Sequence, residues 1–226
     1  MSRELLRNLR AVIFDFDGTL AETEIDFDEM RRRTREHIKQ WGLWEEGMGE
    51  RRYVLELIEH AELKLPDDPA RRQQYRAEAA QILEDVEMLT CPQAAPFPGT
   101  VEALSRLRAC GYAIGIVTRN CHRGVQAVTD RHHLPYDVLL TRDDVEKVKP
   151  DPAHVHEALE RLDVSPGETI MVGDHITDIQ VGKAVGMVTC GVLTAAATNE
   201  ELEAAGADLV LDDVAALGAL LCSDHR

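Results

Sequence analysis

The chain has 226 residues, enough to bury a sizeable core, and a formal net charge of −16 at neutral pH. This charge argues against a nucleic acid partner, because nothing would offset phosphate repulsion over an extended surface. No apolar run approaches the roughly 20 residues that a bilayer-spanning helix needs, and the first residues lack the apolar core of a signal peptide. We therefore expect a cytoplasmic protein with no membrane partner.

The N-terminal part joins a buried strand to a pair of acids. The apolar, β-branched run at 11–14 predicts a fully buried strand, and the acids Asp15 and Asp17 follow it in the string Asp-Phe-Asp-Gly-Thr-Leu. Gly18 allows a sharp turn, and Thr19 is expected to hydrogen-bond within that turn. Two buried acids would raise each other's pKa. A divalent cation would hold both, because Mg²⁺ prefers carboxylate and phosphate oxygens.

Residues 23–92 have helical rather than strand periodicity. Three apolar stripes are expected there: Phe27, Met30, Thr34, Ile38 and Trp41; Val54, Leu57, Ile58, Ala61 and Leu65; and Tyr75, Ala79, Ile82, Val86 and Leu89. Asp68 and Pro69 suit the start of the third helix. The pattern predicts an all-helical domain inserted between two parts of a main domain, 1–22 and 93–226, with a proline-rich return at 91–99.

Basic residues gather in the predicted insertion. They are Arg31, Arg32, Arg33 and Arg35, followed by Arg51 and Arg52. We expect most of them on a solvated helix face paired with nearby glutamates, and one or two are open to a role in contacting the outer part of a substrate.

From residue 100 onwards, helices and apolar strands alternate. Strands are expected at 113–117, 138–140, 169–172, 188–193 and 209–211, with helices at 100–109, 123–131, after 152, at 176–185, after a capping box that begins at Thr198, and at the C-terminus. This alternation predicts an α/β fold, a doubly wound, Rossmann-like parallel sheet covered on both faces. Ligands of such sheets bind at the carboxyl ends of the strands.

Polar residues stand at those strand ends. Thr118, Arg119 and Asn120 follow the strand at 113–117, and their hydroxyl and amides suit a phosphate. Lys149 precedes the helix after the third strand, and Asp174 ends the strand at 169–172, with Asp178 four residues further on.

In their order and placement, these residues resemble the four motifs of the haloacid dehalogenase superfamily. The helical insertion resembles the first cap class of that superfamily, found in phosphoglycolate-phosphatase-like members. The resemblance implies that Asp15 is the nucleophile, Asp17 the general acid and base, and Lys149 a catalytic cation. It also implies phosphate binding by Thr118, Arg119, Asn120 and Lys149, and Mg²⁺ binding by Asp15, Asp174 and the Asp17 carbonyl, supported by Asp178.

Two residues depart from the commonest form of these motifs. Arg119 is interpreted either as a phosphate or substrate contact or as a solvated loop residue. His175, directly after Asp174, is expected near the metal or at the rim of the site.

The resemblance implies a magnesium-dependent phosphatase acting on a small phosphorylated metabolite through an aspartyl-phosphate, as a monomer or homodimer. A phosphomutase of the same superfamily stays open, since the sequence does not tell whether the insertion excludes water. A phospho-acceptor signalling domain is the alternative from another class, and Asp17 argues against it. Asp17 also disfavours a dehalogenase, and Lys39 and Lys64 stand in no recognisable Schiff-base pattern.

The five cysteines, Cys91, Cys110, Cys121, Cys190 and Cys222, are scattered and without metal-ligand spacing. We expect them to be reduced thiols.

Overall fold

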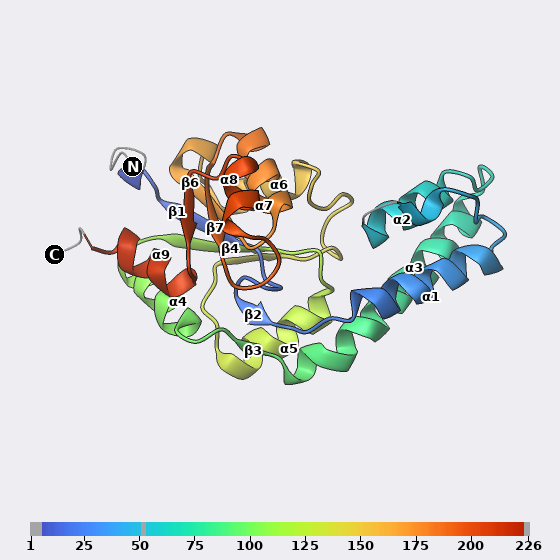
Figure 1. Cartoon of the computed structure of the whole chain (residues 1–226), viewed down its shortest axis with the longest axis horizontal. Helices are drawn as coiled ribbons and strands as arrows, with labels where there is room; N and C mark the ends of the chain where they lie inside the picture. The colour runs from blue at the N-terminus through green and yellow to red at the C-terminus, as the bar shows by residue number, and fades with distance from the viewer. Residues whose placement is uncertain (1–5, 51–52, 224–226) are drawn as a thin grey trace. The chain divides into compact units, whose positions relative to one another are not determined.

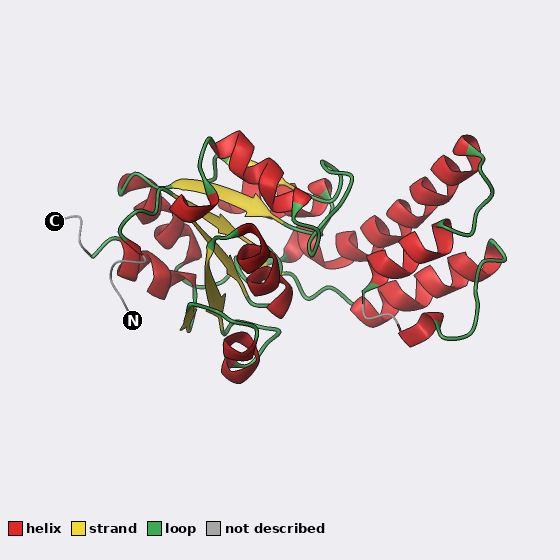
Figure 2. Cartoon of the chain, turned by 90° about the horizontal axis from the view of Figure 1, so that it is seen from above, coloured by secondary structure: helices red, strands yellow, loops and turns green. Residues whose placement is uncertain are grey.

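The computed structural model of the chain describes residues 6–50 and 53–223 (Figures 1 and 2). It divides into two compact units: Glu24–Pro92, and the residues before and after that segment. Arg51 and Arg52, which belong to the predicted basic cluster, lie outside the described residues.

The larger unit is built on a six-stranded parallel sheet with the order β5-β4-β1-β6-β7-β8. The strands are β1 (Ala11–Phe14), β4 (Ala113–Val117), β5 (Val138–Leu140), β6 (Thr169–Gly173), β7 (Val188–Val192) and β8 (Leu209–Leu211). Phe14, the last residue of β1, is in register with Ile116 of β4 and Val172 of β6. The ends of these three central strands therefore lie side by side, and the predicted doubly wound α/β fold is confirmed.

Helices cover both faces of this sheet (Figure 1). They are α4 (Thr100–Ala109), α5 (His122–His132), α6 (Ala153–Leu162), α7 (Ile176–Val185), α8 (Asn199–Ala204) and α9 (Val214–Leu221), with a short 3₁₀ turn at Pro166–Glu168. Because side chains alternate along a strand, Val12 and Phe14 enter one core cluster and Ile13 the other. Both faces of β1 are thus buried, which explains its uninterrupted apolar sequence.

A two-stranded antiparallel ribbon was not predicted from the sequence. It pairs β2 (Ala21–Glu22) with β3 (Ala95–Pro96), in the register Ala21 with Pro96 and Glu22 with Ala95. Strands of two residues carry no periodic signal, and Pro96 reads as a strand breaker. The ribbon places the chain on each side of the 24–92 unit at adjacent positions.

The smaller unit is all-helical, as predicted. It contains α1 (Phe27–Gln40), α2 (Val54–Glu62) and α3 (Pro69–Thr90), with 3₁₀ turns at Met48–Glu50 and Cys91–Gln93. Asp26 and Asp68 cap α1 and α3 by accepting bonds from main-chain N–H groups of the first turn. The shared core includes Met30, Ile38, Leu57, Tyr75, Leu83 and Val86.

Two apolar residues assigned to the core stripes are in fact exposed. Phe27 is 59% exposed and Leu89 is 60% exposed. Each lies in a terminal turn of its helix, beyond the core that Met30 and Val86 enter. Helical periodicity continued to the helix ends, but burial did not.

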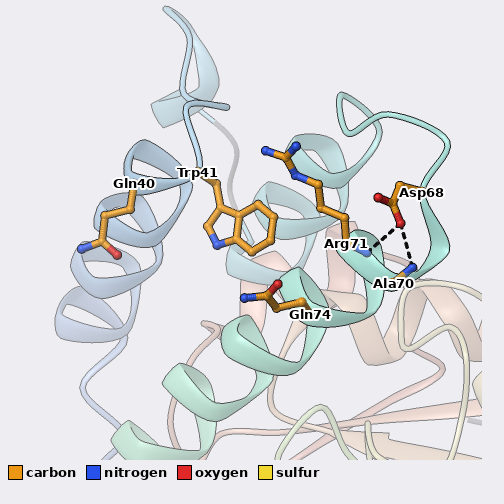
Figure 3. Close-up of a pocket in the computed structure, with 6 residues that line it drawn as sticks. All are labelled: Gln40, Trp41, Asp68, Ala70, Arg71 and Gln74. Atoms are coloured by element: carbon orange, nitrogen blue, oxygen red, sulfur yellow. Dashed lines mark hydrogen bonds between the residues drawn. The ribbon is translucent and has the colours of Figure 1, made fainter.

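The expected pairing with glutamates is confirmed for Arg32 and Arg33, whereas Arg35 lies over the Trp44 ring. Arg32 binds Glu29 and Glu36, and Arg33 binds Glu29. The smaller unit also contains a pocket of about 570 Å³, lined by Gln40, Trp41, Asp68, Ala70, Arg71 and Gln74 (Figure 3). Arg71 stacks over the Trp41 ring at 5.7 Å, and none of the predicted site residues lines this pocket.

The expectation that all cysteines are reduced is wrong for one pair. Cys110, after α4, and Cys222, after α9, form a disulfide with their Cα atoms 6.1 Å apart. They are 112 residues apart in the sequence, and only the packing of α4 against α9 brings them together. Cys91, Cys121 and Cys190 are buried and in no disulfide.

Across the described residues, no helix has the length and apolar character needed to cross a membrane.

Candidate active site

Three acids meet at the carboxyl ends of β1 and β6. Asp15 directly follows β1, and its N–H donates to the Val172 carbonyl of β6, so it continues the strand. Asp174 follows β6, and Asp178 lies in the first turn of α7. Carboxylate oxygens of these three residues all lie within 4.8 Å of one another.

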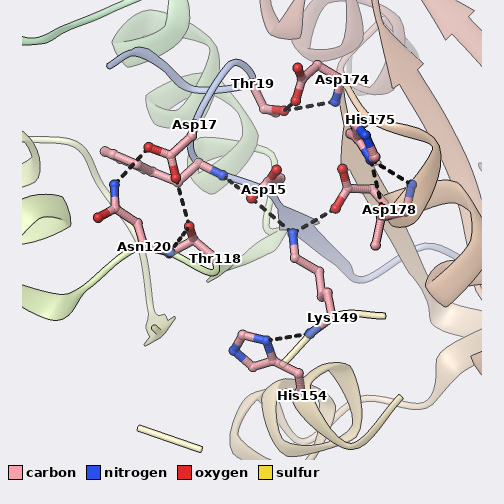
Figure 4. A network of polar contacts seen from close by, with 12 residues as sticks. Asp15, Asp17, Thr19, Thr118, Asn120, Lys149, His154, Asp174, His175 and Asp178 are labelled. Carbon is pink, nitrogen blue, oxygen red and sulfur yellow. Dashed lines mark hydrogen bonds and ion pairs between the residues drawn. The ribbon is translucent and has the colours of Figure 1, made fainter. Parts of the chain in front are cut away.

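Lys149 bridges two of these acids (Figure 4). Its Nζ lies 2.9 Å from Asp15 Oδ1 and 2.7 Å from Asp178 Oδ1, with the lysine side chain 2% exposed. Burial alone would lower the pKa of Lys149, but the charges of Asp15 and Asp178 outweigh it and raise that pKa. The lysine is therefore a fixed cation between two carboxylates.

Asp174 is held from two sides. The Thr19 hydroxyl donates to Oδ1 at 3.1 Å, and the Ala196 N–H donates to Oδ2 at 2.9 Å. A Cβ at Gly18 would lie 2.5 Å from Asp174 Oδ2, so only glycine fits that turn. Burial, with the nearby charges of Asp15 and Asp178, raises the pKa of Asp174 to about 7.

The two carboxylate oxygens of Asp178 differ in their hydrogen bonding. Oδ1 binds Lys149, whereas Oδ2 is buried and accepts no hydrogen bond from any described residue. Burial raises the pKa of Asp178, and the Lys149 ammonium opposes that rise. Three clustered carboxylates with one unused buried oxygen form the hard-oxygen donor set that suits Mg²⁺.

The Asp17 carboxylate points away from this cluster. It accepts hydrogen bonds from Thr118 Oγ1 at 3.0 Å, Asn120 Nδ2 at 2.8 Å and Thr23 Oγ1 at 2.8 Å. Three neutral donors from two segments, the loop after β4 and Thr23, fix its orientation. The sequence-based assignment of Asp17 to the metal concerned its main-chain carbonyl, and that assignment stays a prediction.

The loop after β4 is ordered by its own side chains. Asn120 N–H donates to Thr118 Oγ1 at 3.0 Å, and Cys121 N–H donates to Asn120 Oδ1 at 2.7 Å. Thr118 and Asn120 are buried, and Arg119 is partly exposed. The carbonyl of Arg119 accepts a bond from Arg142 Nη1 at 3.1 Å. The predicted phosphate loop thus lies beside Asp17, and its phosphate-binding role remains a prediction.

Several residues of the network were missed or misassigned from the sequence. Thr19 was expected to bond within its own turn, but its hydroxyl reaches Asp174, 155 residues away. Thr23 was not singled out, although a hydroxyl just before a domain boundary was a usable signal. His175 caps α7, because its Nδ1 accepts the Thr177 N–H at 3.1 Å.

His154, in the first turn of α6, contacts the main chain of Lys149. It is fully buried, and its Nδ1 accepts the Lys149 main-chain N–H at 3.3 Å. Burial and the Lys149 charge lower the pKa of His154 to about 4, so the ring stays neutral and able to accept. Sequence spacing gave no sign of this contact.

Comparison with known proteins bears on this geometry. Residues 12–192 match the family described as haloacid dehalogenase-like hydrolase. Over 225 aligned residues the chain is 31% identical to the pyrophosphatase PpaX of Bacillus mycoides, an alignment that covers 94% of this chain and 97% of that protein.

Two solved structures share the fold. CbbY from Rhodobacter sphaeroides, solved in complex with phosphate, is 25% identical with a TM-score of 0.64, covering 93% of this chain and 96% of CbbY. A predicted phosphoglycolate phosphatase from Haemophilus somnus is 19% identical with a TM-score of 0.64, covering 94% and 98% of the two chains. The second likeness speaks for the fold alone.

Proposed function

The chain belongs to the haloacid dehalogenase-like hydrolases and is a phosphatase-type enzyme of that family, and we propose that it hydrolyses a small phosphorylated metabolite. The proposed reaction uses Mg²⁺ and passes through an aspartyl-phosphate on Asp15. The observation that carries the proposal is the buried Lys149 ammonium held between Asp15 and Asp178, with Asp174 beside them. Such an arrangement stabilises charge on a nucleophile and on the phosphoryl group it attacks.

Asp15, Asp174 and the Asp17 carbonyl would hold the Mg²⁺, supported by Asp178. The donor set fits, because the three acids are clustered and Asp178 Oδ2 lacks a partner among the described residues. When bound, the cation supplies positive charge that offsets the carboxylates and the phosphoryl oxygens.

In the first step, an Asp15 oxygen forms a bond to phosphorus while the bond to the leaving oxygen breaks. Asp15 Oδ1 is engaged by Lys149 and by the Phe16 N–H at 2.7 Å, so Oδ2 is the oxygen we assign to the attack. We assign the phosphoryl oxygens to the 118–120 loop, where the Thr118 hydroxyl would turn from Asp17 to the phosphate and Arg119 would reach it from the same loop. Protonated Asp17 delivers its proton to the departing alkoxide.

In the second step, water attacks the phosphorus of the aspartyl-phosphate. Asp17, now a carboxylate, takes a proton from that water, the bond from phosphorus to Asp15 breaks, and inorganic phosphate leaves. The donors Thr118, Asn120 and Thr23 hold the Asp17 carboxylate in one orientation for this step.

The substrate class follows from the relatives only in outline. A small phosphorylated metabolite suits the clustered acids and Lys149, and inorganic pyrophosphate belongs among the compounds tested because one relative is a pyrophosphatase. Phosphate release across a panel of such compounds, with Mg²⁺ and with excess chelator, identifies the preferred substrate. Transfer of phosphate within a sugar phosphate, without release, would instead indicate a phosphomutase.

The mechanism is tested by separating the two acids of the first motif. Asp15→Asn removes the nucleophile, so turnover should stop. Asp17→Asn should slow alkyl phosphates by about 10²–10⁴-fold, because proton transfer is lost. With an activated aryl phosphate, whose leaving group needs no proton, Asp17→Asn should instead accumulate phosphoenzyme.

Rapid quench with a labelled aryl phosphate at saturating Mg²⁺ gives the answer. Label trapped on Asp17→Asn but not on Asp15→Asn supports the covalent route. Steady consumption of substrate by Asp17→Asn with no labelled protein would mean direct attack by water and would overturn the proposal.

A further inference from the structure

The turn after β5 lies against the loop that follows β4. Thr118 N–H donates to the Leu140 carbonyl at 3.0 Å, Arg142 N–H donates to the Asn120 carbonyl at 3.2 Å, and His122 N–H donates to Asp143 Oδ2 at 2.8 Å. Every contact joins residues 140–143 to residues 118–122. These hydrogen bonds fix the main-chain path of residues 118–122.

The Arg142 side chain also contacts the 118–122 loop. The side chain is 7% exposed, and its Nη1 donates to the Arg119 carbonyl at 3.1 Å. Its Nε lies 3.8 Å from Oδ1 of Asp143, whose side chain is 44% exposed. An arginine is rarely buried without a specific set of acceptors, and here a main-chain carbonyl of the loop is one of them.

The bond to the Arg119 carbonyl has a consequence on the other side of the same peptide. That peptide carries the Asn120 N–H, which donates to Thr118 Oγ1 at 3.0 Å. Thr118 Oγ1 in turn donates to Asp17 Oδ2 at 3.0 Å. Hydrogen bonds in such a chain polarise and orient one another, so the guanidinium acts on the Thr118 hydroxyl through one rigid peptide plane.

We propose that Arg142 is a positioning residue, which fixes the 118–120 loop for phosphate binding and orients Asp17 through Thr118. Its positive charge, 3.1 Å from the Arg119 carbonyl, also favours an anion bound to this loop. The inference rests on the proposed function, because it assumes that residues 118–120 bind the substrate phosphate. It adds a residue outside the four motifs to the machinery.

The test replaces the guanidinium by an apolar side chain of similar length, Arg142→Met. Inorganic phosphate is used as a competitive inhibitor of an aryl phosphate, so binding is measured apart from chemistry. We expect the inhibition constant of phosphate and KM to rise about ten- to hundredfold, the value of one hydrogen bond to a charged group. Arg142→Lys, which keeps the charge and one donor, should recover part of this loss.

Arg161→Met is the matched control, since Arg161 is 46% exposed and pairs with Glu157 on α6. It should leave KM and the phosphate inhibition constant unchanged. Thermal unfolding of each variant shows which fraction is folded at the assay temperature. If Arg142→Met does not fold, Arg142→Lys decides, with at least a threefold rise in the inhibition constant expected.

Two failures are distinguishable. A wild-type protein that releases phosphate from no phosphate ester or pyrophosphate overturns the proposed function. An active wild type, together with a folded Arg142 variant whose KM and phosphate inhibition constant stay within twofold of wild type, overturns the role of Arg142 alone.

Discussion

At the scale of single residues, Gly173 shows how tightly the acid cluster is packed. It is the last residue of β6, and a Cβ built there would lie 2.3 Å from Asp178 Cγ. Gly173→Ala must therefore displace Asp178 from Lys149. We expect kcat to fall by about 10²-fold, the effect of a displacement near 1 Å at a catalytic site, and Tm to fall as well.

Gly167→Ala is the control for this substitution. A Cβ at Gly167 meets nothing within 4 Å, so kcat and Tm should stay at or slightly above the wild-type values. Steady-state kinetics and thermal unfolding of both variants make the comparison. Wild-type kcat in Gly173→Ala would mean that the position of Asp178 does not matter for turnover.

Individual residues also mark the limit of prediction from sequence. Asp15 and Asp174 could be found because they stand directly after strands, and parallel strands bring those ends together. Lys149 and Asp178 could be found because the family motifs they resemble place them after β5 and β6. The contacts of Thr19 and Asn120 could not be predicted, because a side chain that follows a strand can point in several directions. Hydrogen bonds to Asp174 and Asp17 fix the directions of these two side chains, and each bond joins residues more than 100 positions apart.

At the scale of elements, the β2–β3 ribbon makes the helical unit removable. Glu22 and Ala95 are paired, so their Cα atoms are only about 5 Å apart. A flexible linker of roughly four residues in place of 24–92 spans that gap at little entropic cost and keeps Thr23 beside Asp17. The two units also have separate core clusters.

We therefore expect the shortened chain to unfold cooperatively on heating, to keep aryl phosphatase activity and to lose selectivity among metabolites. Far-ultraviolet circular dichroism and the phosphate-release panel measure these properties, with the full chain as reference. An unfolded product would show that residues 24–92 complete the main core.

Elements with an apolar run or a helical period were predictable, and the two-residue strands β2 and β3 were not. The helix α7 and the strands β4 and β8 have the expected bounds, because apolar periodicity or an apolar run marks their residues. The exposed ends at Phe27 and Leu89 were assigned to the core because periodicity does not tell where a helix outruns its neighbours.

The disulfide between Cys110 and Cys222 joins the ends of α4 and α9 and closes a loop of more than 100 residues. By loop entropy, such a link stabilises the fold by about 5 kcal/mol relative to the reduced chain. Urea unfolding of the oxidised wild type should show this difference on adding reductant. In Cys222→Ser, the reductant should have no effect, and the variant should match the reduced wild type.

Wild-type stability that does not respond to reductant would contradict this role, and α9 would then depend on apolar packing alone. That packing is substantial, since Leu217 and Leu221 enter the main core cluster and the Tyr112 hydroxyl donates to the Leu221 carbonyl at 3.4 Å.

At the scale of the whole molecule, a protein of net charge −16 brings three of its acids together in one largely buried site. The overall charge and the fold class were both readable from the sequence. The electrostatic state of the site was not, because burial rather than composition raises the pKa of Asp174 to about 7. Folding thus brings carboxylates together at a cost in free energy, and a bound cation would lower that cost.

The raised pKa of Asp174 makes both the stability of the fold and its affinity for Mg²⁺ depend on pH. An acid with a raised folded pKa contributes stability while it is protonated, and that contribution is lost as the pH rises from the unfolded value near 4 through about 7. Mg²⁺ requires the ionised form, so it binds more weakly at low pH.

With chelator, Asp174→Asn should be more stable than wild type at pH 8, by about 2–4 kcal/mol. With Mg²⁺, wild type should gain Tm, and its affinity for Mg²⁺ should be about 30-fold higher at pH 8 than at pH 5.5.

Thermal unfolding across a Mg²⁺ titration at both pH values measures all of these quantities. Asp130→Asn, an exposed acid on α5, should behave as wild type throughout. Asp174→Asn should lose both the gain in Tm from Mg²⁺ and its pH dependence, because the group that must shed a proton is gone. If Mg²⁺ raised the Tm of wild type equally at pH 5.5 and pH 8, or raised that of Asp174→Asn as much as wild type, Asp174 would not be a ligand, and the acid cluster would need another explanation for its burial.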